Sequence, residues 1–255
     1  MNPSLHPTLR LLLPLLLFWS AAADAGEVKV AVAANFTDAA REIAGRFERW
    51  SGHTAKVSYG SSGKLYAQIE HGAPFEVLLA ADAERPAKAE AEGLAVPGSR
   101  FTYAEGRLVL WSAAADRFED GGAYLNGGAF RRAAIANPKT APYGAAARQV
   151  LERLGLWGRL SDRLVRGDSI AQAFQFTATG NAEAGLVALS QVKGWRGEPG
   201  SLWVIPASYY DPIAQQAVLL KRGEENPAAR AFLAFLRGAE ARAVIAGYGY
   251  GVPMK

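Results

Sequence analysis

Strands that lead into helices through short turns of small polar residues recur along this chain, and this pattern constrains its fold most. The apolar, β-branched segments alternate with amphipathic ones in a regular order. Strands are predicted over 27–33, 54–59 and 75–81, and helices over 38–50, 65–71 and 82–92. Such alternation is typical of a parallel sheet covered by helices.

The pattern restarts near Glu105, which indicates a second α/β unit. Strands are predicted over 107–111, 130–136, 164–166, 185–189, 202–205 and 217–220, and helices over 145–154, 172–179 and 227–246. From about Pro212 the chain has no strand–helix–strand unit of its own and is expected to return to the first lobe. We therefore predict two doubly wound α/β lobes, residues 26–105 plus 212–255 and residues 106–211. A two-strand hinge would join them, with a cleft between.

The first 25 residues have the features of a secretory signal peptide. Arg10 supplies positive charge, the apolar core over 11–19 is too short to span a bilayer reliably, and Ala23-Asp24-Ala25 fits a small-x-small cleavage site. We expect the mature chain to begin at Gly26, with cleavage after Ala23 as the alternative. The segment predicts export, with a Gram-negative periplasm as the expected location.

Composition excludes several classes of function. The chain of 255 residues has a net charge of +4 with no Lys/Arg-rich block, so we expect no nucleic-acid binding. It has no cysteine, which excludes disulfides, zinc–thiolate sites and thiol nucleophiles. After export only His53 and His71 remain, and neither has a carboxylate at metal-ligand spacing. An exported hydrolase is disfavoured because Gly60-Ser61-Ser62-Gly63 is not a nucleophile elbow.

The points where strands lead into helices carry mostly neutral donors. Ala34 and Asn35, Ser61 and Ser62, Tyr143, and Ser169 with Ile170 all lie at such points. Each could simply cap or begin its helix. Together, the free N–H groups of helix first turns and neutral side chains suit a fully ionised tetrahedral oxyanion. Asp168 is the nearest acceptor for a protonated anion, but we expect it to cap the helix that begins near Ile170.

Six segments together resemble the periplasmic molybdate-binding proteins of molybdate ABC transporters, which have a type II periplasmic binding protein fold. They cover most of the mature chain in the family's order: VAVAANFTDAA (30–40), YGSSGKL (59–65), GAPFEVLLAAD (72–82), ANPKTAPYG (136–144), GDSIAQAFQF (167–176) and GLVALSQV (185–192). The resemblance implies anion contacts at Asn35 with the Ala34 backbone, Ser62, the Tyr143 backbone and the Ile170 backbone. The Tyr143 hydroxyl could add a donor where some members have a tyrosine at the position of Ala188.

The resemblance implies a solute-binding protein rather than an enzyme. It would capture molybdate, and by similarity of size tungstate, and deliver it to an inner-membrane permease of an ABC transporter. No catalytic residue, no cofactor and no direct protein ligand to molybdenum is expected, and the chain is expected to be a monomer. A binding protein for sulfate or another tetrahedral oxyanion is the alternative.

Overall fold

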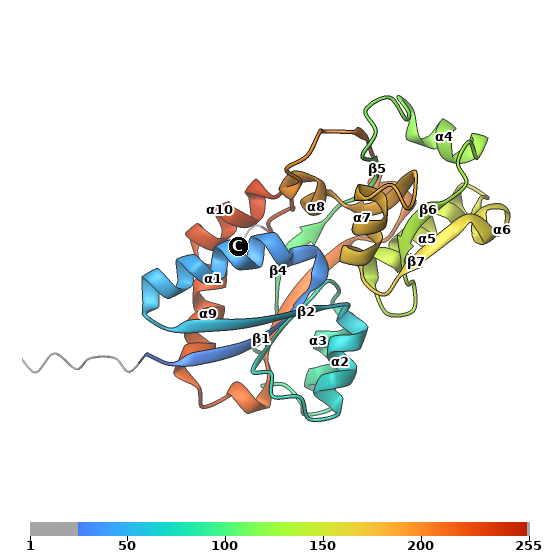
Figure 1. Ribbon diagram of the computed structural model, residues 1–255. Coiled ribbons are helices and arrows are strands. Elements are labelled where there is room, and N and C mark those ends of the chain that lie inside the picture. The colour runs from blue at the N-terminus through green and yellow to red at the C-terminus, as the bar shows by residue number, and fades with distance from the viewer. Residues whose placement is uncertain (1–24, 254–255) are drawn as a thin grey trace, which may run out of the picture.

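The computed structural model describes residues 25–253, and it contains two five-stranded sheets in separate lobes (Figure 1). In the first lobe the strand order is β2-β1-β3-β10-β4. Its strands are β1 (Glu27–Ala33), β2 (Thr54–Gly60), β3 (Val77–Ala80), β4 (Phe101–Gly106) and β10 (Ile213–Leu219). Its helices are α1 (Thr37–Ser51), α2 (Ser62–Glu70), α3 (Glu84–Ala91), α9 (Pro227–Arg237) and α10 (Ala239–Gly247). The predicted signal peptide lies outside the described residues, except for Ala25.

The second lobe has the strand order β7-β6-β8-β5-β9. Its strands are β5 (Leu108–Ser112), β6 (Ala133–Ala136), β7 (Leu164–Gly167), β8 (Ala184–Ala188) and β9 (Ser201–Val204). Its helices are α4 (Gly121–Gly127), α5 (Pro142–Arg153), α6 (Trp157–Leu160), α7 (Ile170–Ala178) and α8 (Leu189–Gly194). Short 3-10 turns occur at η1 (Ala34–Phe36), η2 (Ser161–Arg163), η3 (Ala207–Tyr209) and η4 (Lys221–Gly223).

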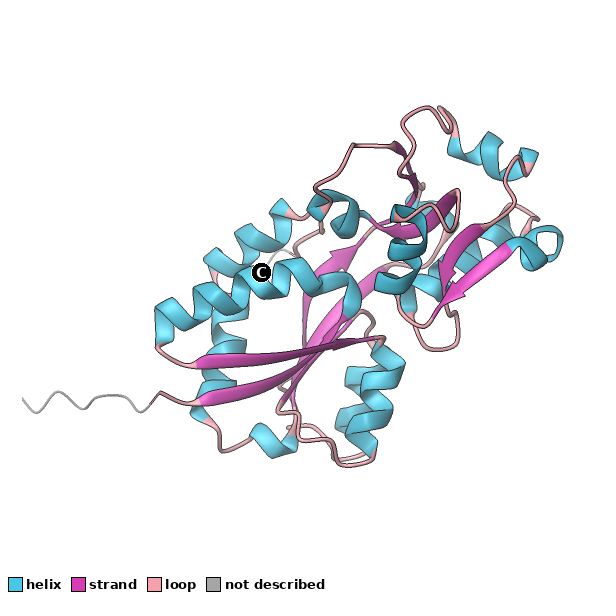
Figure 2. Ribbon diagram, viewed as in Figure 1, coloured by secondary structure: helices cyan, strands magenta, loops and turns pink. Residues whose placement is uncertain are grey.

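Helices cover both faces of the sheets because several inner strands are almost entirely apolar. Every residue of β3, β5, β6 and β8 is buried, the pattern of a strand covered on both faces. In the first lobe α1, α9 and α10 lie on one side of the sheet and α2 and α3 on the other (Figures 1 and 2). The predicted fold class, two α/β lobes, is confirmed.

The sheets are mixed, whereas the alternation predicted parallel ones. β10 pairs antiparallel with both β3 and β4, and β5 pairs antiparallel with β8 and β9. The reason is the path of the chain, which leaves the first sheet along β4 and re-enters it along β10 from the second lobe. The chain changes sheets between Gly106 and Leu108 and again between Val204 and Ile213. The exact lobe boundaries at 105/106 and 211/212 stay a prediction.

Several helix ends differ from those predicted. α5 begins at Pro142 rather than Ala145, because proline is well suited to the first position of a helix. α7 begins at Ile170 rather than Gln172, with Ser169 as its N-cap. The predicted final helix over 227–246 is two helices that meet at the extended residue Gly238. Within residues 25–253, no helix has the length and apolar character needed to cross a membrane.

Candidate anion-binding site

Four helix starts, two from each lobe, meet at one small cavity. The first lobe contributes the η1–α1 start and the start of α2, and the second lobe contributes the starts of α5 and α7. The lining residues are Ala33, Ala34, Asn35, Gly60, Ser61, Ser62, Ala81, Ala141, Pro142, Tyr143 and Ile170. All five predicted contact residues therefore lie around the same space. Their contacts with an anion stay a prediction.

The electrostatic character of this cavity is positive although no lining residue is charged. The N–H groups of a helix's first turn have no partner within the helix, and the helix dipole places partial positive charge there. The 3-10 turn η1, which leads into α1, and the helices α2, α5 and α7 all present this end to the cavity. Nearly all of the lining is buried, with Ser62 at 0% and Tyr143 at 1% exposure, so these dipoles act where water screens them little.

The two serines of the turn differ in their hydrogen bonding. Ser62 is the first residue of α2, and its Oγ accepts a hydrogen bond of 2.9 Å from the backbone N–H of Ala81. This bond uses an acceptor position and leaves the hydroxyl proton free. Ser61 is the N-cap residue, yet its Oγ caps nothing and is buried without a hydrogen-bond partner in the described part of the chain. Both serines line the cavity, and of the two only Ser62 has a side-chain hydrogen bond in the described structure.

Asn35 is held by a buried network behind the cavity. Its Nδ2 donates to Gln215 Oε1 at 2.9 Å and to the Tyr250 hydroxyl at 3.0 Å. Its carbonyl oxygen accepts from the Ser190 hydroxyl of the second lobe at 2.9 Å. Among the described residues its Oδ1 has no partner, although it is buried. The position of Asn35 is therefore fixed from both lobes, and one end of its amide remains unsatisfied.

Tyr143 lies between the anion cavity and the hinge. Its hydroxyl accepts from Gln215 Nε2 at 3.3 Å, and it packs so closely on Gly106 of β4 that a Cβ there would collide with it. Burial raises the pKa of Tyr143 well above its usual value, with neighbouring tyrosines adding to the shift, so this hydroxyl stays protonated. The hydroxyl is oriented toward the hinge strands, and Tyr143, the second residue of α5, lines the cavity.

Gln215 connects these groups, and no sequence pattern identified it. It is fully buried on β10, where its Oε1 accepts from Asn35 and from the Tyr103 hydroxyl while its Nε2 donates to Tyr143. Sequence analysis did not identify it because two consecutive glutamines, Gln215 and Gln216, do not reveal which one faces inward. Only the register of β10 between β3 and β4 decides this.

Charged side chains lie outside the cavity. The Asp82 carboxylate, one residue after Ala81, pairs with the Arg85 guanidinium at 3.1 Å, and its burial raises its pKa. A larger charged groove of about 760 Å³ lies between α1, α10 and the end of α8. We call it the charged groove, and it is lined by Asp38, Arg41, Glu42, Arg46, Lys193, Gly194, Trp195, Arg196, Ala243, Val244, Gly247 and Tyr248. Its mixed, hydrated charges suit a desolvated dianion less well than the neutral cavity does.

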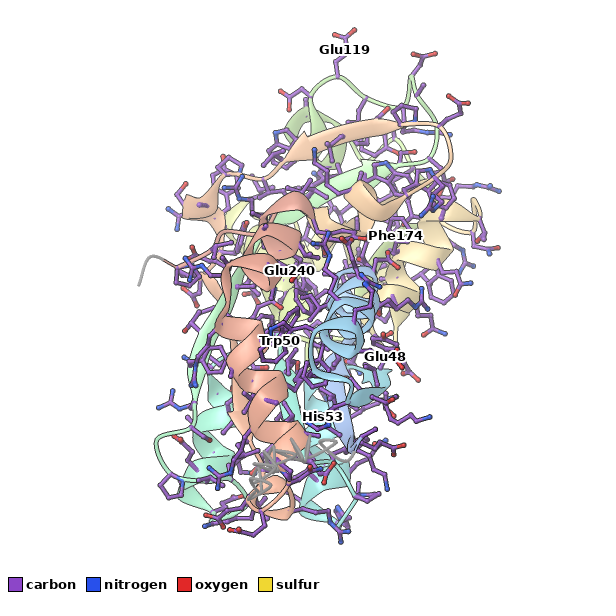
Figure 3. All side chains as sticks on the ribbon, turned by 90° about the vertical axis from the view of Figure 1, so that its left-hand side faces the viewer. Glu48, Trp50, His53, Glu119, Phe174 and Glu240 are labelled. Atoms are coloured by element: carbon purple, nitrogen blue, oxygen red, sulfur yellow. The ribbon has the colours of Figure 1, made fainter. Side chains whose placement is uncertain are left out.

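Two residues considered from the sequence have other roles. Asp168 was expected to cap α7, and this is wrong because the Ser169 side chain accepts from the Gln172 N–H and serves as the cap. Asp168 instead forms an ion pair with Lys64 of the first lobe. His53 accepts from the Gly26 N–H at 2.9 Å and lies near Trp50, well away from Phe174 of α7 (Figure 3).

A family model described as bacterial extracellular solute-binding protein matches residues 28–251. This chain belongs to the bacterial extracellular solute-binding protein family. The solute-binding protein is 56% identical over 232 residues to the molybdate-binding protein ModA of Azotobacter vinelandii, covering 91% of this chain and 92% of that one. It is 55% identical over 228 residues to ModA of Rhodobacter capsulatus, covering 89% of each.

A solved structure gives the same result in three dimensions. The periplasmic molybdate-binding protein of Azotobacter vinelandii superposes with a TM-score of 0.86 at 45% identity in the structural alignment. The alignment covers 89% of this chain and 100% of that chain. The solute-binding family and fold predicted from the sequence motifs are therefore confirmed.

Proposed function

We propose that this protein binds molybdate, and by similarity of size tungstate, in the cavity between its lobes and delivers it to the permease of an ABC transporter. The observation that carries the proposal is the convergence of four helix N-termini on a neutral, buried cavity that both lobes complete. Relatives that are identical to this chain at more than half of the aligned residues are named molybdate-binding proteins.

In this proposal the anion is held by hydrogen-bond donors alone. The side-chain amide of Asn35, the backbone N–H groups of Ser62, Tyr143 and Ile170 and the hydroxyl of Ser62 donate to its oxygens, with the Ala34 backbone beside them. Donors to a charged group form the stronger class of hydrogen bond, and helix dipoles add to their effect. No side chain coordinates molybdenum directly, and no cofactor is needed.

The amide of Asn35 would turn when the anion binds. An unpartnered Oδ1 beside a dianion is unfavourable, whereas the Nδ2 end would donate to it. A half-turn of the amides of Asn35 and Gln215 together would let Gln215 Nε2 donate to Asn35 Oδ1 and free Asn35 Nδ2 for the anion. The Tyr143 hydroxyl would then donate to Gln215 Oε1, so we assign the backbone of Tyr143, not its hydroxyl, to the anion.

Binding would be coupled to movement of the lobes. The cavity is small, about 10 Å³, so a tetrahedral anion enters with the lobes apart and its walls must yield as they close. Closure around the anion would bring α2 and α7 together and present a different surface to the permease. The proposed location is the periplasm, and the proposed state is a monomer that makes and breaks no covalent bond.

Selectivity tests the proposal. Titration calorimetry of the chain from Gly26 onward should show tight, one-to-one binding of molybdate and tungstate. Sulfate, the alternative anion, should bind far more weakly. Hydrogen phosphate should hardly bind at neutral pH because, with Asn35 Nδ2 turned toward the anion, the proposed site offers the phosphate proton no acceptor. Phosphate binding as tight as that of molybdate would contradict the donor-only site, and preferred binding of sulfate would favour the alternative.

A further inference from the structure

Beside the cavity, the two lobes touch through two polar contacts that no anion-binding role requires. The backbone N–H of Gly63 donates to the Thr140 carbonyl oxygen at 2.9 Å, and Lys64 Nζ lies 2.8 Å from Asp168 Oδ2. Gly63 and Lys64 follow Ser62 in the first turn of α2. Asp168 lies two residues before Ile170. The contacts thus join the start of α2 to the segments that lead into α5 and α7.

The backbone contact depends on glycine at position 63. A Cβ there would lie 3.0 Å from the Thr140 carbonyl oxygen and 3.1 Å from the Thr140 Cα, so one lobe would have to move. These are backbone atoms, which cannot turn aside as a flexible side chain can. The close approach of α2 to the second lobe therefore requires the absence of a side chain at this residue.

The ion pair is placed to act across the cleft. Of the ion pairs formed by residues 25–253, Lys64–Asp168 is the one that joins the lobes. Its side chains are 47% and 74% exposed, so the pair lies at the rim and not within the cavity. The long, flexible side chain of Lys64 can keep this contact while the cavity walls adjust to an anion.

We propose that Gly63, Lys64, Thr140 and Asp168 form a latch that holds the lobes closed and slows release of the anion. The inference rests on the proposed function. These residues position the walls of the site without contacting the anion. Because the latch exists only when the lobes meet, its loss accelerates opening and leaves capture by the open protein nearly unchanged.

A simpler electrostatic role for these charges predicts the opposite result at one position. If Lys64 and Asp168 acted only through their fields, Asp168 would repel the dianion, and Asp168→Asn would slow its release. In a latch, Asp168→Asn breaks the pair and speeds release, as Lys64→Met does. The sign of the change at Asp168 therefore separates the two explanations.

The test measures release of radiolabelled molybdate from the saturated protein after addition of excess unlabelled molybdate. An exposed pair of this kind predicts release that is about 1.5- to 5-fold faster in Lys64→Met and in Asp168→Asn, with no further gain in the double variant. The difference from the parent should disappear near 1 M salt, where screening is strong. Gly63→Ala, which changes no charge, should also release faster.

Lys88→Met is the matched control. Lys88 is 48% exposed and pairs with Glu70 at 2.9 Å inside the first lobe, so its loss should leave release unchanged. Slower or unchanged release in Asp168→Asn would overturn the latch while leaving molybdate binding intact. A parent protein that retains no molybdate would overturn the proposed function, and the latch with it.

Discussion

Replacement of Ser62 by alanine is expected to weaken both anion binding and folding, for separate reasons. In the proposed site the Ser62 hydroxyl donates to the anion, and its Oγ accepts from the Ala81 N–H at 2.9 Å. Ser62→Ala removes both interactions without adding bulk. The side chain is fully buried, so water cannot readily replace either one.

The magnitude of each loss follows from the groups left unpaired. A hydrogen bond to a charged group contributes about 1.5–3 kcal/mol, which corresponds to a loss of affinity of roughly ten- to a hundredfold. The buried Ala81 N–H would lose its acceptor, at a cost of about 1–3 kcal/mol in the free energy of unfolding. Titration calorimetry with molybdate measures the first loss, and urea unfolding of the anion-free protein measures the second.

Ser61→Ala is the matched control, because Ser61 is equally small, adjacent and buried but forms no hydrogen bond in the described structure. Its molybdate affinity should change by less than threefold. Its unfolding free energy should not fall, because the variant removes a buried hydroxyl without a partner, whose burial costs about 1–3 kcal/mol. If Ser61→Ala lost affinity while Ser62→Ala kept it, the hydroxyl donor would be assigned to the wrong serine. If neither variant lost affinity, the anion would not lie at the start of α2.

At the hinge, Gly106→Ala would place a Cβ against the Tyr143 hydroxyl and 2.8 Å from Gln215 Nε2. We expect this contact to hold the lobes apart and to lower the molybdate affinity measured by calorimetry at least tenfold. Unchanged affinity would show that the hinge relaxes freely. Gln215→Leu removes the acceptor that Asn35 and Tyr103 share, although each keeps a second one, the Tyr250 hydroxyl and the Ala80 carbonyl. We therefore expect a loss of about 1–3 kcal/mol in urea unfolding, and a loss below about 0.5 kcal/mol would contradict the network. Burial raises the pKa of Tyr103, Tyr143 and Tyr250, so they stay protonated in the folded protein while the unfolded chain ionises above a pH of about 10. Folding stability should not vary with pH through these groups below that value, and above it the three should lower stability by up to about 4 kcal/mol per pH unit. Tyr103→Phe should reduce the measured slope by about 1.4 kcal/mol per pH unit.

The parts of the site that the sequence located are those with a local pattern. Asn35, Ser62 and Ile170 each follow a strand and begin or precede a helix. The alternation of elements therefore places each of them at the carboxyl end of a strand, two in the first sheet and Ile170 in the second. Tyr143 was located for the same reason, although the start of its helix was placed three residues late. The role of Gln215 could not be predicted, because it depends on the register of β10 between two strands that are distant in sequence.

The elements that were missed lack a local signal. α4 has the sequence GGAYLNG, which contains three glycines and has low helix propensity. It is capped by the Asp120 side chain, which accepts from the N–H groups of Gly122 and Ala123. β4, with the sequence FTYAEG, has too few apolar residues to be recognised alone, and its strand character comes from pairing with β10. The Lys64–Asp168 pair is likewise set by the contact between lobes.

The central claim is that the anion lies where the four helix starts converge, and anomalous scattering from molybdenum tests it most directly. Crystals grown with molybdate and measured near the molybdenum absorption edge would give the position of the metal independently of any model of the protein. We predict one dominant anomalous peak in the cavity, with anion oxygens within hydrogen-bonding distance of the Ser62 hydroxyl and the Ile170 N–H. A dominant peak in the charged groove beside Arg41 and Lys193, with none between the helix starts, would contradict the account.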